Sequence, residues 1–306
     1  MSIIQKPFDP QVHLPAMFAL GLAHPARSIH YIDLPYRLSS PSLQDPGNVG
    51  IWCDPGGALI GWAALQFQFW TLDFAVHPLF EKEFFAAMLP WFERQSGASA
   101  EERDLWFVNI FSEDHDRLQI FENAGFESQS DKGEDSWSKV WMVRSGTDPV
   151  PQFRIPSGFT IRPIKGAAEV PAYVDLHQTT FETKNMVIPW RMRTLTQPGY
   201  TPELDLVVET PQGTLGAFCI CWTATLPDGK RVGQVEPLGC HPSFRNYALG
   251  RLALVEGLRR LVDLGMHEIF VETDNYRDTA FRLYESLGFT TTREILVLGK
   301  SLSKTP

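Results

Sequence analysis

An internal repeat constrains the fold of this chain of 306 residues more than any other feature. Four segments of the first half recur in the second half in the same order: residues 34–38 with 188–192, 54–61 with 210–216, 76–80 with 240–244, and 118–126 with 281–289. The spacing agrees as well, because His77 precedes Gly125 by 48 residues and His241 precedes Gly288 by 47. Repetition on this scale indicates a tandem repeat of one fold. A segment rich in Pro, Gly and Ser predicts a linker over residues 147–157, between a first copy at residues 1–146 and a second copy at residues 158–306.

A strand and a long helix of the second copy are joined by a short segment that suits a bound anion. Residues 233–240 are an apolar run of strand length, and Leu and Val recur at helical spacing over residues 249–262. Between them, the small residues Ala248 and Gly250 let N–H groups of the first helical turn approach a ligand, and such unsatisfied amides favour an anion. Arg245 at the entrance suits a phosphate. Taken alone, the pattern also fits an ordinary helix start with surface arginines.

A second motif follows in residues 280–289 (AFRLYESLGF), which predict a short amphipathic helix ended by Gly288. The order of strand, R-x-x-A-x-G turn, long helix, strand and A-x-x-x-Y-E-x-x-G-F resembles the GCN5-related N-acetyltransferase (GNAT) family over roughly residues 155–300. Two positions depart from the family pattern. Ala248 replaces the first glycine of the turn, and Arg277 stands where the family often has an asparagine, with Asn275 nearby.

The resemblance implies an α/β (α+β) fold class with two tandem GNAT-like acyl-CoA N-acyltransferase folds, each a mixed central sheet flanked by helices. We expect each copy to run strand, two helices, three antiparallel strands, helix, strand, helix and closing strands. The resemblance also implies acetyl-CoA as cosubstrate, with its pantetheine arm held by backbone amides of Leu238, Gly239 and Cys240. Pro237 in the same strand cannot donate to a sheet ladder, which fits a strand that parts from its neighbour. The other expected cofactor residues are Arg245, Asn246, Tyr247, Ala248, Leu249, Gly250, Arg251 and Asn275.

Aligning the two His-Pro pairs compares the copies position by position. The first copy then has Glu81, Phe84 and Phe121 at the positions of Arg245, Ala248 and Tyr284 in the second. An acidic side chain at an anion site repels a pyrophosphate, and a Phe side chain covers the amides that must face it. We therefore expect a degenerate, non-catalytic first copy and a catalytic second copy.

Acyl transfer from a thioester to an amine needs a base for the ammonium proton and an acid for the departing thiolate. Glu236 is the expected base, because a carboxylate in an otherwise apolar strand is uncommon and burial would raise its pKa. A carboxylate that caps a neighbouring strand or loop is an alternative of equal weight. Tyr284 is the expected acid, since Phe121 at the matching position indicates that packing there does not require a hydroxyl. His241 recurs as His77 in the first copy, so we assign it to turn structure.

The second copy begins with a predicted helix over residues 167–180 and an irregular stretch over residues 181–190. In the resembled family this region forms part of the acceptor pocket, which implies that Glu182, Asn185 and Trp190 help to select the substrate. A solvated loop with one anchoring Trp fits the same residues equally well.

The net charge of −9 argues against nucleic-acid or anionic-membrane partners, which need clustered Lys and Arg. It leaves a small molecule that carries an amine as the expected partner. No run of 18 apolar residues occurs and the N-terminus lacks the apolar core of a signal peptide, so we expect a cytoplasmic protein without a membrane span. The cysteines and histidines lack metal-ligand spacing, which predicts reduced thiols and no metal. The oligomeric state stays open.

The first functional hypothesis is an acetyl-CoA-dependent N-acetyltransferase that moves an acetyl group to a primary amine of a small molecule by direct attack on the thioester. The alternative is a non-catalytic acyl-CoA-binding or regulatory module. A third hypothesis is a protein-interaction scaffold without a cofactor. Glu236 and Tyr284 discriminate between the first two, because a module that only binds needs neither polar group.

Overall fold

The computed structural model describes residues 2–98, 104–275 and 277–302. The strands of the first copy are β1 (Ile4–Lys6), β2 (Val49–Cys53), β3 (Leu59–Gln66), β4 (Thr71–Val76), β5 (Leu105–Phe111), β6 (Glu127–Ser128) and β7 (Ser138–Ser145). Its helices are α1 (Pro10–Ala23), α2 (Leu34–Arg37), α3 (Glu81–Ala98) and α4 (His115–Asn123). The strands of the second copy are β8 (Thr160–Pro163), β9 (Asp205–Glu209), β10 (Leu215–Thr225), β11 (Arg231–Cys240), β12 (Glu268–Asp274) and β13 (Thr290–Ser301). Its helices are α5 (Val170–Phe181), α6 (Ile188–Thr194), α7 (Leu249–Asp263) and α8 (Asp278–Glu285).

The element order of the second copy is the one expected: β8, two helices, three antiparallel strands, α7, β12, α8 and β13. The first copy repeats it with β1, α1 and α2, β2 to β4, α3, β5, α4 and β7. Most neighbouring strands are antiparallel, but β11 pairs with β12 and β4 with β5 in parallel, so the sheet is mixed. The predicted fold class, a mixed α/β sheet flanked by helices, is confirmed.

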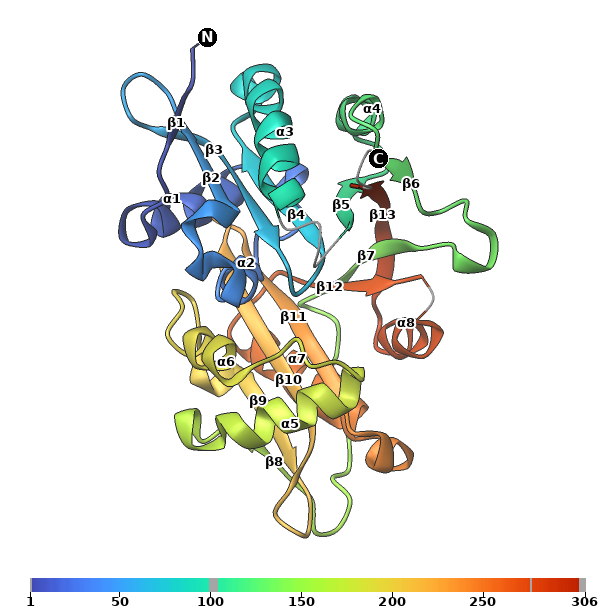
Figure 1. Ribbon diagram of the computed structural model, residues 1–306. Helices are drawn as coiled ribbons and strands as arrows, with labels where there is room; N and C mark the ends of the chain where they lie inside the picture. The colour runs from blue at the N-terminus through green and yellow to red at the C-terminus, as the bar shows by residue number, and fades with distance from the viewer. Residues whose placement is uncertain (1, 99–103, 276, 303–306) are drawn as a thin grey trace.

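The helices of the second copy cover both faces of its sheet. On one face, Leu252, Leu258 and Leu261 of α7 lie in the same buried cluster as Val208 and Val235 of the sheet. Burying a leucine side chain stabilises the fold by roughly 1.5–3 kcal/mol, so this face alone fixes α7 on β9 to β11. On the other face lie α5 and α6, which Figure 1 shows in front of the sheet.

The described strands form one continuous sheet in the order β1-β2-β3-β4-β5-β13-β7-β12-β11-β10-β9-β8, with β6 beside β13 (Figure 1). The closing strands of the two copies have therefore changed places. Strand β13 pairs with β5 of the first copy, Leu298 opposite Val108, and β7 pairs with β12 of the second copy, Val143 opposite Phe270. The two exchanged strands also pair with each other.

A hydrophobic cluster joins the copies as well, because Tyr31, Tyr36 and Trp141 of the first copy pack with Tyr173 and Trp222 of the second. Residues 147–157 contain no helix or strand, which is expected of a linker. The division into domains at residues 146 and 158 stays a prediction, since each copy completes its sheet with a strand of the other.

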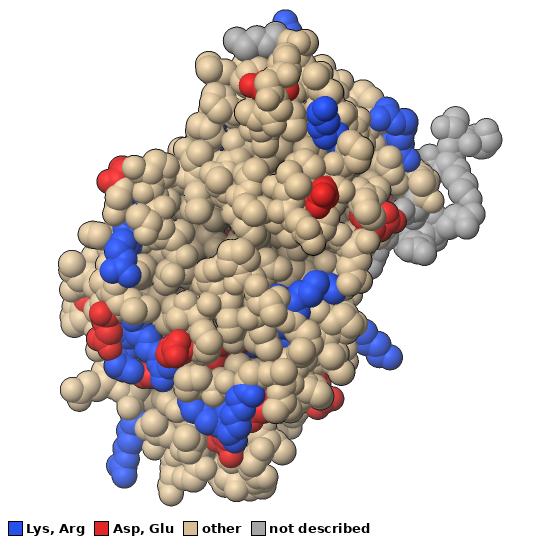
Figure 2. Space-filling model, turned by 90° about the vertical axis from the view of Figure 1, so that its left-hand side faces the viewer, with Lys and Arg blue, Asp and Glu red and all other residues tan. Residues whose placement is uncertain are grey.

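Charges of both signs lie side by side on the face shown in Figure 2, with uncharged surface between them. Among the described residues, no helix is both long and apolar enough to cross a membrane. The same residues hold no group of three or more His, Cys, Asp or Glu placed to bind a metal ion. The four cysteines are free.

Candidate active site

A cavity of about 430 Å³ lies between the two copies, here called the junction cavity. From the sites expected in the second copy it gathers Glu236 and Leu238 on β11, Tyr284 on α8, and Asn185 and Trp190 around the start of α6. Elements far apart in the sequence thus bring both expected catalytic side chains to one cavity. The first copy contributes His30, Asp33, Tyr36, Arg37 and Lys139 to the same wall.

Glu236 is half-buried on β11, and its backbone oxygen accepts a hydrogen bond of 2.7 Å from Nε1 of Trp222. Burial, with the neighbouring carboxylates of Asp33 and Glu272, raises the pKa of Glu236 to about 8, although Arg37 and Lys139 oppose the shift. A carboxyl group with such a pKa can take up a proton near neutral pH, which is the property that a general base needs.

Tyr284 is buried on α8, with 6% of its surface exposed. Burial and the nearby Glu236 raise the pKa of its phenol far above the ordinary value. The hydroxyl therefore keeps its proton at neutral pH. A thiolate that develops beside it can accept a hydrogen bond from this hydroxyl.

Strands β11 and β12 part at the cavity. Among the described residues they pair only from Val232 to Gln234 and from Glu268 to Phe270. Successive N–H groups of a strand point to opposite edges, so at least one amide among Leu238, Gly239 and Cys240 faces the gap. This geometry suits an extended chain laid along β11. Burial also raises the pKa of the Cys240 thiol, so this side chain stays protonated at neutral pH.

The expected anion site has the backbone of a ligand-binding turn. A 3₁₀ helix at Pro242–Tyr247 is followed by Ala248 in the left-handed conformation (φ 54°, ψ 32°), and α7 starts at Leu249. A non-glycine residue in that conformation costs about 1–2 kcal/mol. At Gly250 an added Cβ would meet only Cys240, at the ordinary contact distance of 3.4 Å. Packing does not require the missing side chain there, which leaves the bare backbone available to a ligand.

The residues of this turn differ in what they can offer. Arg245, Asn246, Tyr247 and Ala248 are exposed, whereas the side chain of Leu249 is fully buried and only its amide can reach a ligand. Arg251 donates a hydrogen bond of 2.6 Å to Oγ of Ser286 and so joins α7 to α8.

Two expected site residues lie elsewhere. Oδ1 of Asn275 accepts a hydrogen bond of 3.1 Å from the amide of Ser138, so this side chain extends the β12–β7 ladder. Glu182 does not line the cavity. It adopts a left-handed conformation (φ 53°) that ends α5, and it is exposed to solvent.

Trp190 lines the cavity, and it also anchors its segment to the first copy, as the alternative of a solvated loop with one anchoring Trp predicts. Its Nε1 donates to Oγ of Ser39 at 3.1 Å, and its ring lies 5.4 Å from that of Tyr36. Asn185 also crosses between the copies, because its Nδ2 donates to the backbone oxygen of Gln68 at 2.7 Å. The segment is irregular only up to Val187, since α6 begins at Ile188.

Sequence reasoning missed the charged residues that the first copy adds to the cavity. Arg37 donates two hydrogen bonds, of 2.7 and 2.8 Å, to the carboxylate of Asp73. Lys139 donates to Glu272 at 2.7 Å, and although burial alone would raise the pKa of Glu272, Lys139 and then His30 lower it to about 2. One feature of the sequence could have indicated a buried charge here: Arg37 lies inside an apolar segment that is repeated in the second copy. The matching residue of that copy, Arg191 of α6, is buried as well.

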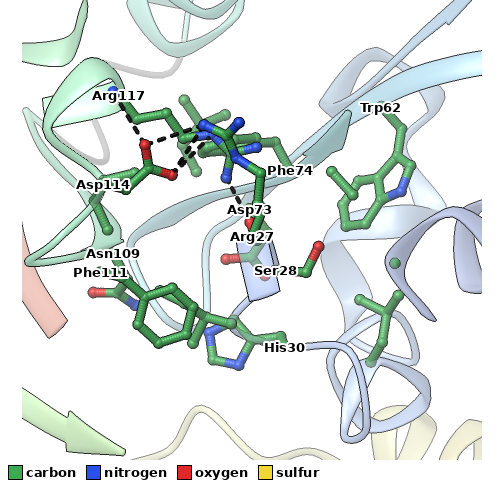
Figure 3. A pocket seen from close by; sticks show the side chains of 16 residues that line it. Arg27, Ser28, His30, Trp62, Asp73, Phe74, Asn109, Phe111, Asp114 and Arg117 are labelled. Carbon is green, nitrogen blue, oxygen red and sulfur yellow. Dashed lines mark hydrogen bonds and ion pairs between the residues drawn. The ribbon is translucent and has the colours of Figure 1, made fainter. Parts of the chain in front are cut away.

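The first copy has a much smaller counterpart of this site, a cavity of about 40 Å³ (Figure 3). Arg27 and Arg117 of its lining meet around Asp114 (Figure 3). Glu81 accepts a hydrogen bond of 2.6 Å from Arg117 and forms an ion pair of 3.2 Å with Arg27. Helix α3 begins at Glu81 itself, four positions earlier in the repeat than α7, and Phe84 is fully buried.

The chain is similar in sequence and in fold to known acetyltransferases. The acetyltransferase (GNAT) family model matches residues 175–289. A mycothiol acetyltransferase of Thermomonospora curvata is 31% identical over 145 residues, which cover 46% of this chain and 48% of that protein. One of Kineococcus radiotolerans is 34% identical over 139 residues, which cover 44% and 43%. The chain thus spans about half the length of the curated relatives that it matches.

Solved structures resemble the whole chain in fold. A tandem GNAT protein from the clavulanic acid biosynthesis pathway aligns over 100% of both chains with a TM-score of 0.65 and 13% identity. A GCN5-related N-acetyltransferase of Sphaerobacter thermophilus covers 98% of this chain and 96% of its own, with a TM-score of 0.62 and 17% identity. At such identities the likeness concerns the fold alone.

Proposed function

We propose that the protein transfers the acetyl group of acetyl-CoA to a primary amine of a small molecule, because the acetyltransferase (GNAT) family model matches residues 175–289 of its second half. The observation that carries the proposal is the convergence of Glu236 and Tyr284 on the junction cavity, beside the gap between β11 and β12. A carboxyl group whose pKa lies near neutral pH and a phenol that stays protonated then face the space where a thioester and an amine would meet.

In this proposal the turn at Arg245–Gly250 holds the pyrophosphate of acetyl-CoA, and β11 holds its pantetheine arm. Amides of β11 that face the gap hydrogen-bond the arm and the thioester oxygen. Glu236 takes the proton that the acceptor ammonium must lose before its nitrogen attacks the carbonyl carbon. Tyr284 gives its phenolic proton to the sulfur as the carbon–sulfur bond breaks, and its phenolate takes up the second proton, which the nitrogen loses as the amide forms. No step needs a covalent enzyme intermediate, which agrees with the protonated Cys240 thiol.

We propose further that the first copy is degenerate as an acetyl-CoA site. The early start of α3 removes the turn, Phe84 fills the position of Ala248, and Glu81 is held between Arg27 and Arg117. The role left to this copy is to form one wall of the acceptor pocket. Mycothiol acetyltransferases among the relatives support a small-molecule acceptor, and the cytoplasmic location stays a prediction.

The non-catalytic alternative would retain the cofactor turn without turnover. It gives no reason for a half-buried carboxyl whose pKa is near 8 to face the cavity. Incubation of the protein with acetyl-CoA and a panel of amines decides between the two, with release of the free thiol followed over time and acetylated product identified by mass. We expect thiol release that depends on the amine. Binding of acetyl-CoA without thiol release for any amine would favour the alternative.

A further inference from the structure

The charges around the junction cavity do not balance. Each of the cations among its described lining residues has a carboxylate partner: Arg37 binds Asp73, Lys139 binds Glu272, and Arg277 lies 2.9 Å from Asp274. Two lining carboxyl groups remain after this pairing, Glu236 and Asp33.

Asp33 is a buried carboxyl group without a cationic partner of its own among Arg37, Lys139 and Arg277. Only 2% of its surface is exposed, and its Oδ1 has no hydrogen-bond partner among the described residues. Its Oδ2 lies 3.4 Å from Nδ1 of His30, which is itself 3.7 Å from Glu272. An unpaired carboxylate at such a depth is costly, because its charge is removed from water.

The neighbouring histidines do not remove the excess of negative charge. Burial and then Arg191 lower the pKa of His177 to about 3, so this lining side chain is neutral at physiological pH. A protonated His30 would stand between Asp33 and Glu272 and could offset one charge at most. When Asp73, the partner of Arg37, is counted with the lining residues, the group would still carry one net negative charge whenever Glu236 is ionised.

We infer that the acceptor of the proposed reaction carries a second cationic group in addition to the amine that is acetylated, and that Asp33 of the first copy holds it. The inference rests on the proposed function, in which Glu236 receives the reacting amine. A diamine, with one nitrogen at Glu236 and the other toward Asp33, supplies a positive charge for each unpaired carboxyl group. The aromatic side chains of Phe69, Phe181 and Trp190 line the cavity and suit the apolar chain between the two nitrogens.

The test compares 1,4-diaminobutane with 1-aminobutane, which has the same carbon chain and one ammonium fewer, as acceptors in the thiol-release assay. We expect kcat/KM of the wild type for the diamine to exceed that for the monoamine on the order of 10- to 100-fold, as for one hydrogen bond to a charged group. Asp33→Asn should reduce this ratio to near one. The ratio is insensitive to changes at Glu236, because both acceptors lose their proton to the same base. The exposed Asp116→Asn serves as the matched control and should leave the ratio unchanged.

A second variant separates recognition from misfolding. Asp33→Glu keeps the charge but lengthens the side chain by one methylene group, so in a series of α,ω-diamines the preferred chain should become shorter by about one carbon. An equal rate with both acceptors, or an unchanged ratio in Asp33→Asn, would overturn the inference while the turnover itself upheld the proposed function. Absence of thiol release with every amine would overturn the proposed function and the inference with it.

Discussion

Glu236 decides at the scale of single residues whether the protein is a catalyst. Replacement by Gln keeps the shape of the side chain but removes the proton acceptor, and a general base contributes about 10²- to 10⁴-fold to rate. We expect Glu236→Gln to lose turnover of that order without loss of acetyl-CoA affinity. The wild-type rate should rise with pH through about 8, where the carboxyl group loses its proton, and the variant should lack this rise. Initial rates from pH 6 to pH 10 measure both, and matching pH profiles would assign Glu236 to structure.

The stability of the same variant provides the control. The pKa of Glu236 is raised in the folded protein above the value of about 4.3 in an unfolded chain. Between these values the folded state binds more protons, so the contribution of Glu236 to stability falls as pH rises from about 4 to about 8. Thermal unfolding should therefore show Glu236→Gln more stable than wild type at pH 8–9 and equal to it near pH 4. Lost activity in a stabilised variant cannot come from unfolding.

The proposed role of Tyr284 as an acid can be tested by replacing it with Phe, the residue at the matching position of the first copy. Phe121 is fully buried there, so Phe fits this position of the fold. We expect Tyr284→Phe to fold normally and to slow acetyl transfer at least about 10²-fold, because the leaving thiolate loses its proton donor. Measurements of kcat and of the unfolding temperature check this. Full activity would show that water supplies the proton.

The types of residue in the sequence were enough to predict part of the candidate site, but not all of it. A carboxylate in an apolar strand and a Tyr matched by Phe in the repeat were enough to predict Glu236 and Tyr284, and both line the cavity. Asp33 and Lys139 could not be predicted, because nothing local distinguishes a buried charge at an interface from a solvated one. Their role depends on contacts between segments more than 100 residues apart.

At the scale of elements, the two long helices differ in where they begin. Helix α7 follows a turn that ends in a left-handed residue, whereas α3 starts four positions earlier in the repeat and has no such turn. Local patterns predicted α7 and β11 to within two residues at each end, since strand and helix periodicity are local properties. The start of α6 at Ile188 was missed because its few residues and Pro189 give no periodic signal.

Exchanging the charges at these two helix starts should affect only one of them. Arg245→Glu removes a charge-assisted hydrogen bond of about 1.5–3 kcal/mol and adds repulsion, so acetyl-CoA affinity should fall at least about tenfold. Glu81→Arg should create no second site, because Phe84 still covers the position and three guanidinium groups would meet with Arg27 and Arg117. Titration of each variant with acetyl-CoA measures both effects. A new site in Glu81→Arg would contradict the steric argument.

At the scale of the whole molecule, the exchanged strands make the two copies one folding unit. No sequence pattern foretold this, because β7 and β13 have strand-like sequences whichever neighbour they pair with. We expect residues 1–146 and 147–306 to fold poorly as separate chains, since β5 and β12 would each lose a neighbour and expose an edge. Circular dichroism and solubility measure this, with the intact protein cut at an engineered protease site in residues 147–157 as the control, which should stay associated. Cooperative unfolding of either isolated half would contradict it.

The central claim is that two copies of one fold share one active centre, with acetyl-CoA on the second copy and the acceptor between the two. A calorimetric titration of the whole chain with acetyl-CoA tests it most directly, because the stoichiometry counts working turns. The structure predicts one site per chain, since one turn has its backbone exposed and the other is replaced by the first turn of α3. Two equivalent sites per chain would contradict the account.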